Sequence, residues 1–416
     1  MTANQAQITA AADAVSFEDD LRATVAAVRE AVIDLMNLAG ANPNRSSDVA
    51  RQLGLRPGLT WKICKVAQET DVVAAVPHMP GPAGLELIFD AFERSGVPQT
   101  AVGTARAAGR AFNRMVETHT GDRQTLMTML GQMSPDQTNG QLEADRKLSF
   151  IGNSSTWGVQ ARLILSTQIV APNPDEPSMV DVAGIFGHYD VRRLRRSAGW
   201  VLLKSLSYND DGSLREDART PLDPGVEPGD GLPLIREFCE GLPDIREVGR
   251  HTGPRFELTE GPVGQTGAFT CVFGSFDRKF ASAYRDERNL FGEHPILVYM
   301  PAETLIADLF VHRDLAFEPP EAQLYSCLFS GMDGAWPRPE QDRMALSEPI
   351  LDLGRPPNVA TPDVPRYPKL LELACERLGS APRDFHGYRL VMSYPPIPTA
   401  LVLRYELADP RHATST

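Results

Sequence analysis

The hydrophobic periodicity of this chain changes near Trp157, and no other feature constrains the fold as strongly. Before that point apolar residues recur every three or four positions, which is the spacing of one helix face. From residue 159 to residue 169 every second residue except Thr167 is apolar, and Pro172 ends the run, as is typical of a strand. We therefore predict an α+β chain, with a helical domain over residues 1–150 followed by a large strand-rich domain with a few helices.

An acidic segment, residues 209–231, interrupts the strand-rich part and separates residues 151–208 from residues 232–416. It holds seven acidic residues, two arginines, three prolines and four glycines, and it has no apolar period. Because such a segment buries too little apolar area to offset its ordering entropy, we predict an exposed, mobile loop or linker. Further strands are expected at 200–206, 268–276, 294–300, 325–329 and 388–405, and helices at 234–239 and 367–378.

Composition places the chain among folded globular proteins. Of its 416 residues 42% are hydrophobic and 23% charged, and the length suits two or three domains. No signal-like leader and no run long enough to span a bilayer occurs, so we expect a cytoplasmic protein without a membrane partner. The cysteines are odd in number and far apart, which disfavours a disulfide framework and predicts reduced, mostly buried thiols. They are Cys64, Cys239, Cys271, Cys327 and Cys375.

Residues 45–70 have the pattern of two short helices around a tight turn. Ser46 or Ser47 can cap the first helix, and Gly54 can supply the positive φ that ends it. The second helix then carries an apolar stripe at helical spacing, formed by Leu59, Ile63, Val66, Ala67 and Thr70. We predict two helices that are broken between Gly54 and Gly58.

The turn of this segment, with Ala50, Leu53, Gly54 and Leu55, resembles that of bacterial helix-turn-helix modules. The resemblance covers residues 45–70 only, and it implies DNA binding by a dimer whose second helices enter two half-sites. Residues 42–68 contain five basic side chains against Asp48 alone, a net charge of +4, on a chain whose net charge is -13. The overall charge opposes general polyanion binding, but the local charge favours contact with phosphate.

Counting 100° per residue places Trp61, Cys64, Lys65 and Gln68 on the side of the second helix opposite its apolar stripe. If this side enters the major groove, Lys65 and Gln68 meet base edges. The phosphate contacts would then come from Arg45, Arg56 and Lys62.

Trp61 supports a second interpretation, because tryptophan has one donor and no acceptor and is typical of protein interfaces. In that case the segment makes protein contacts, either within the chain or in a self-assembling scaffold protein. A helical stripe before the segment can pack on it or pair with a second subunit, so we expect a homo-oligomer. This stripe consists of Leu21, Val25, Val28, Val32 and Leu35.

Two His-x-Asp triplets, at 188–190 and 312–314, can each place two ligands on one face of a strand. Two ligands do not complete a site, and His251 or His294 would complete one only by assumption, so we predict no metal, no cofactor and no catalytic residue. The glycines of 261–267 lead into a strand and predict a turn, not a phosphate cradle; Cys271 in that strand is expected to be a core thiol.

A second basic cluster consists of Arg192, Arg193, Arg195 and Arg196. Arginine forks suit phosphates and carboxylates alike, but a solvated turn paired with acidic residues is the favoured interpretation.

These observations favour a bacterial-type transcriptional regulator with a strand-rich domain for ligand binding or assembly. The alternative is a non-catalytic scaffold protein, and an enzyme of unknown type ranks third. Neither the ligand nor the operator follows from the sequence.

Overall fold

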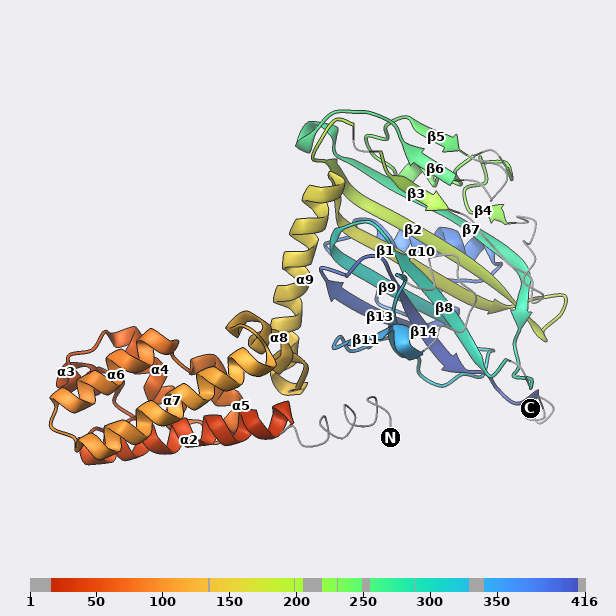
Figure 1. The fold of residues 1–416 in the computed structure, drawn as a ribbon. Coiled ribbons are helices and arrows are strands. Elements are labelled where there is room, and N and C mark those ends of the chain that lie inside the picture. Colours follow the sequence, from red (N-terminus) through yellow and green to blue (C-terminus); the bar gives the residue numbers. More distant parts are fainter. Residues whose placement is uncertain are drawn as a thin grey trace, which may run out of the picture. The chain divides into compact units, whose positions relative to one another are not determined.

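The computed structural model describes residues 16–133, 135–197, 199–204, 219–229, 231–248, 255–287, 289–328 and 340–410. Within these residues the fold is mixed α+β, because the helices lie mostly between residues 17 and 157 and a large strand-rich region follows (Figure 1). Contacts divide the chain into two compact units, residues 1–138 and 139–416. The boundary predicted at residue 150 falls inside the helix α9 (Pro135–Trp157), which crosses from one unit to the other.

The first unit is built from helices. They are α2 (Phe17–Leu38), α3 (Ser46–Leu53), α4 (Pro57–Gln68), α5 (Val72–Ala75), the 3-10 turn η1 (Val76–His78), α6 (Pro82–Arg94), α7 (Gln99–His119), α8 (Arg123–Met133) and the first residues of α9. The local signals that predicted them are visible in the structure. Ser16 caps α2 by accepting a hydrogen bond from the Asp19 amide at 3.2 Å, and Gly40 follows that helix at a φ of 64°.

The predicted helical stripe of α2 lies in the core of the first unit. All five of its residues are fully buried, and they pack with residues of α6 and α7 such as Phe89 and Phe112. The expectation that this stripe pairs with a second subunit is therefore wrong, because its apolar area is already covered by the unit's own helices.

The described residues of the second unit form three sheets. The seven-stranded sheet has the order β12-β13-β9-β1-β2-β7-β4, a four-stranded sheet has the order β11-β10-β14-β8, and a small one has the order β3-β6-β5. The strands are β1 (Val159–Pro172), β2 (Met179–Arg193), β3 (Val201–Lys204), β4 (Thr220–Pro221), β5 (Ile245–Val248), β6 (Arg255–Leu258), β7 (Phe269–Ser282), β8 (Phe291–Val298), β9 (Ala302–His312), β10 (Glu321–Ser326), β11 (Arg343–Met344), β12 (Leu351–Gly354), β13 (Phe385–Ser393) and β14 (Thr399–Glu406).

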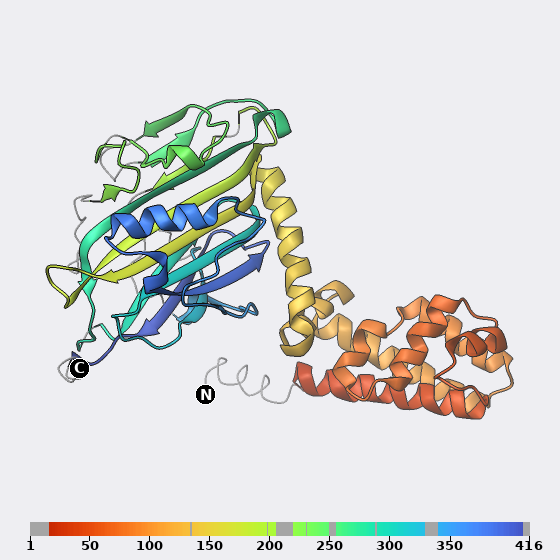
Figure 2. The ribbon, with the colours of Figure 1, turned by 180° about the vertical axis from the view of Figure 1, so that it is seen from behind.

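The seven-stranded sheet is covered on both faces. The helix α10 (Tyr367–Arg377) lies across one face, as Figure 2 shows, and buries Leu370, Leu371 and Cys375 there. The four-stranded sheet packs on the other face through residues such as Ile296 and Leu401. Because both faces of the sheet are buried, the central strand β1 is apolar on both sides. Its consecutive residues Leu163, Ile164 and Leu165 are all buried.

Several sequence expectations for this unit are confirmed, and others need correction. β1 and α10 occur where they were predicted, whereas residues 234–239 form only a 3-10 turn, η2 (Arg236–Phe238). β2 and β9 were not predicted at all. The segment 388–405 is two strands, since Tyr394 adopts a φ of 48° and residues 394–398 connect β13 to β14.

The predicted acidic loop at 209–231 lies partly outside the described residues, which resume at residue 219. The first described residues of this segment are not the exposed loop that was predicted. Thr220–Pro221 form β4 at the edge of the large sheet, and the Leu222 side chain is fully buried against residues such as Ile235. The expectation of an exposed loop is therefore wrong at Pro221 and Leu222, because these apolar side chains find a place in the core.

Candidate functional site

The predicted pair of helices at 46–70 is present, and the two-helix prediction is confirmed. α3 ends at Gly54, whose φ of 62° lies in the left-handed region, and α4 begins with Pro57 at its first position. No serine side chain caps α3, since Arg45 holds the cap position without a side-chain hydrogen bond. The prediction of a Ser46 or Ser47 cap is therefore wrong, although the helix itself begins at Ser46.

The side of α4 that carries Ile63, Val66 and Ala67 is buried in the core of the first unit, as are Thr60 and Cys64. Cys64 was expected on the outer side, and its burial corrects that expectation. Leu59 is only half-buried and Thr70 is exposed, so the buried side is turned slightly from the predicted stripe.

The opposite side of α4 faces solvent. Lys62 and Gln68 are exposed, Lys65 is half-buried, and the side chain of Trp61 is 46% exposed. Arg45 and Arg56, which precede the two helices, are exposed as well. The residues proposed from sequence for DNA contact are therefore all at least partly accessible, and they are here together called the α4 surface: Arg45, Arg56, Trp61, Lys62, Lys65 and Gln68.

Two members of the α4 surface also make contacts within the first unit. The Gln68 Nε2 donates hydrogen bonds to the Pro43 carbonyl at 2.7 Å and to Asn44 Oδ1 at 3.2 Å. The Trp61 ring stands edge-on against His78 of η1, with ring centroids 5.3 Å apart. The Gln68 side chain would have to break these two hydrogen bonds before its amide could contact a base. No such hydrogen bond is described for Lys62 or Lys65 of α4.

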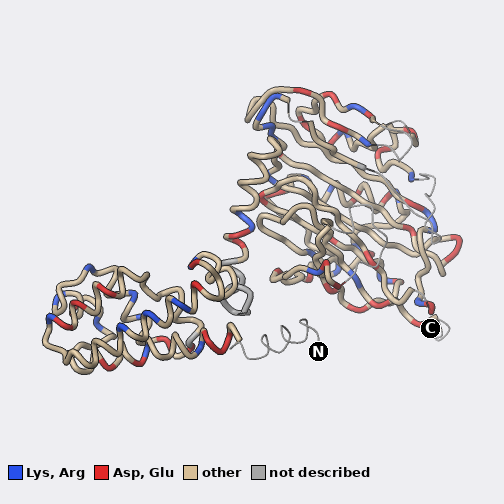
Figure 3. The backbone as a smooth tube through the Cα atoms, viewed as in Figure 1, with Lys and Arg blue, Asp and Glu red and all other residues tan. Residues whose placement is uncertain are grey.

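The charge around the α4 surface is positive within a unit of mixed charge. Basic and acidic residues are interspersed in both units (Figure 3). Near α4 the acidic side chain of Asp48 lies 3.4 Å from Arg51, and both groups are exposed. This pair is too solvated to remove the excess of positive charge on the α4 surface.

The second basic cluster is the predicted solvated turn only in part, since Arg195 and Arg196 are exposed in a bend and turn whereas Arg193 is not, and the hydrogen bonds described for Arg193 and Arg195 are not to acidic residues. Arg193 is fully buried and donates a hydrogen bond to the Thr259 carbonyl at 2.7 Å. Arg195 donates to the carbonyls of Thr156 and Trp157, both at 3.1 Å, and so satisfies the last turn of α9. These arginines bind backbone carbonyls, which sequence spacing does not reveal.

The two His-x-Asp triplets differ. His188 is buried against Phe273, whereas Asp190 has a φ of 50° and accepts a hydrogen bond from Arg162 at 2.5 Å. In the second triplet the imidazole does lie beside the carboxylate: His312 Nδ1 accepts a hydrogen bond from the Asp314 backbone at 3.2 Å and is 3.6 Å from Asp314 Oδ2. Over the part of the chain that the structure describes, no group of three or more His, Cys, Asp or Glu side chains is placed to hold a metal ion.

The second unit buries a charged network that sequence reasoning missed. Arg389 of β13 donates two hydrogen bonds to Asp308 of β9, at 2.8 and 2.7 Å. The Tyr367 hydroxyl donates to the same carboxylate at 2.6 Å and lies 2.7 Å from Thr167 Oγ1. Burial raises the pKa of Asp308 while Arg389 opposes that shift. Since every member has a partner, the network ties α10 to three central strands and offers no open position to a substrate.

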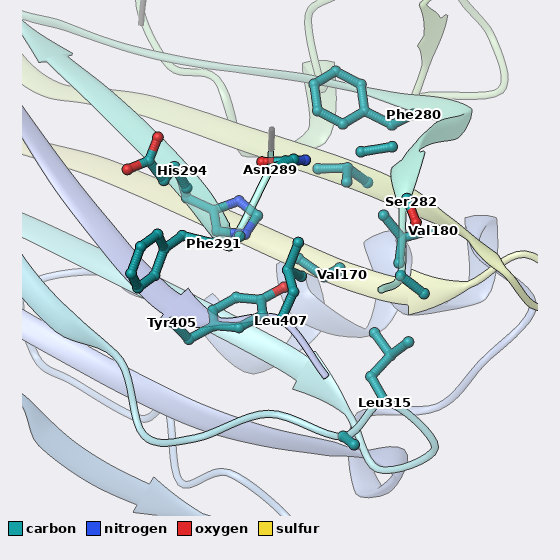
Figure 4. Close-up of a pocket in the computed structure, with 16 residues that line it drawn as sticks. Val170, Val180, Phe280, Ser282, Asn289, Phe291, His294, Leu315, Tyr405 and Leu407 are labelled. Atoms are coloured by element: carbon teal, nitrogen blue, oxygen red, sulfur yellow. The ribbon is translucent and has the colours of Figure 1, made fainter. Parts of the chain in front are cut away.

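A cavity of about 170 Å³ opens in the second unit where β8 and β14 meet the ends of β1, β2 and β7 (Figure 4). Its walls are mostly apolar, with Val170, Val180 and Leu315 among them. His294 of β8 lines it and is buried, and its Nε2 has no hydrogen-bond partner among the described residues. Burial lowers the pKa of His294 to about 4, so the ring is neutral at pH 7.

Tyr405 of β14 stacks on His294 with ring centroids 5.8 Å apart. It can lie there because its cross-strand partner is Gly292, where a Cβ would be 2.6 Å from the tyrosine Cζ. Of these cavity residues only His294 was considered from the sequence, as a metal ligand.

Comparison of the chain with protein-family models, with curated proteins and with solved structures finds no match. No helix within the described ranges is long and apolar enough to cross a membrane.

Proposed function

We propose that the protein is a transcriptional regulator that binds duplex DNA through the α4 surface. The observation that carries the proposal is the division of α4 into two sides: Ile63 and Val66 are buried in the unit's own core, whereas the basic side is left accessible. The exposed first turn of α4, with Gly58 next to Pro57, allows a close approach to a groove.

In this proposal Arg45, Arg56 and Lys62 contact phosphates, and Lys65 contacts a base edge. Phosphate contacts release counterions, so the affinity falls steeply with salt. A fluorescence-anisotropy titration with a pool of random-sequence duplex DNA, at low and at moderate salt, measures this directly. Absence of binding at low salt would overturn the proposal.

A second function, self-assembly through the same surface, is favoured by the half-exposed Trp61. Light scattering of the wild-type chain and of Trp61→Ala distinguishes the two. If the surface serves assembly, the wild-type chain should be an oligomer that the Trp61→Ala substitution dissociates, and it should not bind DNA. If the protein instead binds DNA and does not assemble through Trp61, Trp61→Ala should have the same particle size as the wild type. DNA binding should then require the basic side chains of the α4 surface.

For the strand-rich unit the proposal is a ligand-binding role, located in the His294 cavity. Its volume is close to the roughly 150 Å³ of an engineered cavity that admits benzene, so a ligand of about one ring fits. A neutral histidine offers no counter-charge, and Glu293 also lines the cavity, so a neutral compound with one hydroxyl group suits it better than an anion.

Benzyl alcohol is a suitable probe of this cavity in ligand-observed NMR. In Gly292→Ala the added Cβ displaces the Tyr405 ring. This variant should therefore show no saturation transfer from the protein to benzyl alcohol. Gly152→Ala, on α9 where an added Cβ meets nothing within 4 Å, is the matched control and should leave it intact. Equal signals from the two variants would contradict a ligand role for this cavity.

A further inference from the structure

Two cysteines far apart in the sequence are brought face to face in the second unit. Glu240 and Thr270 form an isolated antiparallel bridge and exchange both backbone hydrogen bonds, at 3.0 and 2.8 Å. The next pair outward is therefore Cys239 opposite Cys271, at a position without backbone hydrogen bonds. At such positions Cα atoms are about 4.5 Å apart, inside the range of about 4.4 to 6.8 Å that a disulfide tolerates.

The side chain of Cys239 is directed toward the strand that carries Cys271. Its Sγ lies 3.3 Å from both the amide nitrogen and the carbonyl oxygen of Val272, the residue after Cys271 in β7. Cys239 itself has extended backbone angles, φ -98° and ψ 145°, as expected of a residue in a β-bridge. Both side chains are therefore held next to the same short stretch of β7.

The two thiols differ in environment. Cys271 is fully buried, whereas Cys239 is half-buried at the end of η2. The neighbouring Cys271 thiol lowers the pKa of Cys239, whereas the same neighbour together with burial raises the pKa of Cys271. Of the two thiols, Cys239 is therefore the one that ionises more readily to the nucleophilic thiolate, beside a thiol that keeps its proton.

We propose that Cys239 and Cys271 are a peroxide-sensitive dithiol pair that closes to a disulfide. The Cys239 thiolate attacks one oxygen of hydrogen peroxide, so that an S–O bond forms, the O–O bond breaks and water leaves after taking up a proton. The Cys271 sulfur then attacks the Cys239 sulfur, the S–S bond forms, and the S–O bond breaks. The second water leaves with the Cys271 proton, so two thiols are oxidised and one peroxide is reduced.

This inference is independent of DNA binding and of the His294 cavity. Two of the other thiols provide internal controls. Cys375 lies on the buried side of α10, where burial raises its pKa to about 12. Cys64 belongs to the first unit, and its pKa is also raised by burial. Neither has the combination of a neighbouring thiol and a lowered pKa that Cys239 has.

The test uses the full chain, treated with hydrogen peroxide, alkylated under denaturing conditions and digested without reductant. Mass spectrometry should find a cross-linked peptide pair holding Cys239 and Cys271, two hydrogens lighter than the reduced pair. Cys375→Ser should keep the cross-link, whereas Cys239→Ser and Cys271→Ser should lose it. In Cys271→Ser, Cys239 should instead be trapped as a sulfenic acid by dimedone.

The proposal is overturned if wild-type Cys239 accumulates as sulfenic or sulfinic acid while Cys271 remains alkylatable. It is equally overturned if Cys64 or Cys375 is oxidised before Cys239. The presence or absence of the Cys239–Cys271 peptide in the wild-type protein is sufficient to test the proposal. The test therefore does not depend on whether Cys271→Ser folds.

Discussion

The two units of this chain differ in where they keep their charges. The core of the helical unit is apolar, and none of its described arginines is fully buried. Arg106 pairs with Glu86, Asp90 and Glu93, and the half-buried Arg123 donates hydrogen bonds to backbone carbonyls. The strand-rich unit buries the Asp308–Arg389 pair together with His188, His294 and Arg193. A surface charge is available to a partner at little cost, whereas a buried one is already engaged or must be kept neutral. This contrast is the reason why the proposed contact with DNA is assigned to the helical unit, whereas the stability of the strand-rich unit should depend on its buried polar groups.

The largest effect should follow from breaking the buried pair. Asp308→Asn leaves the Arg389 guanidinium buried without a counter-charge, and we expect the free energy of unfolding to fall by about 3 to 5 kcal/mol. Urea denaturation followed by circular dichroism measures it. Asp90→Asn, which removes one of the three acidic partners of Arg106 and is itself exposed, is the matched control and should change stability only slightly. If both substitutions cost the same, the distinction between the units fails.

Acid should destabilise the strand-rich unit through His188 and His294. Burial lowers the pKa of each histidine from 6.5 to about 4. Below pH 6.5 the two histidines are therefore protonated in the unfolded chain while they stay neutral in the folded chain. The stability from these groups is complete above pH 6.5 and is lost as the pH falls toward 4. Between pH 7 and pH 5 we expect a loss of about 2 kcal/mol for each histidine.

Hydrogen exchange resolved by mass spectrometry, corrected for the intrinsic rate at each pH, locates this loss. Protection should fall in β2, β8 and their neighbours, and His188→Gln should reduce the pH dependence. Protection of these strands that does not change between pH 7 and pH 5 would be inconsistent with buried neutral histidines.

The helical unit was predictable because its signals are local. Gly54, Pro57 and the spacing of Ile63 and Val66 lie within a few residues of the turn that they define. The strand β9 was missed because its partners are distant in the sequence: β1 pairs in parallel with β9, Ala161 opposite Ala302. β9 is buried at nearly every position, so it lacks the alternation that reveals a strand. The same applies to the Cys239–Cys271 pair, which only the bridge at Glu240 brings together.

The smallest effects should appear in the turn of the helical unit. Gly54 lies at a φ of 62°, so Gly54→Ala should destabilise the chain by about 1 kcal/mol although nothing lies within 4 Å of the added Cβ. Gly58→Ala, in the first turn of α4 with equal open space, should stabilise it by about 0.5 kcal/mol. Thermal unfolding compares the two. Effects of the same sign would mean that the turn geometry is not the one described.

The salt dependence of DNA binding tests the central claim most directly. Removing one phosphate contact reduces the slope of log affinity against log salt by about 0.9. Lys62→Ala on the exposed side of α4 should therefore lower the slope by about that amount for every DNA sequence. Arg110→Ala, an exposed cation of the same unit on α7, should leave it unchanged. A wild-type slope near zero, or equal slopes for the two variants, would contradict a DNA-binding role for the α4 surface.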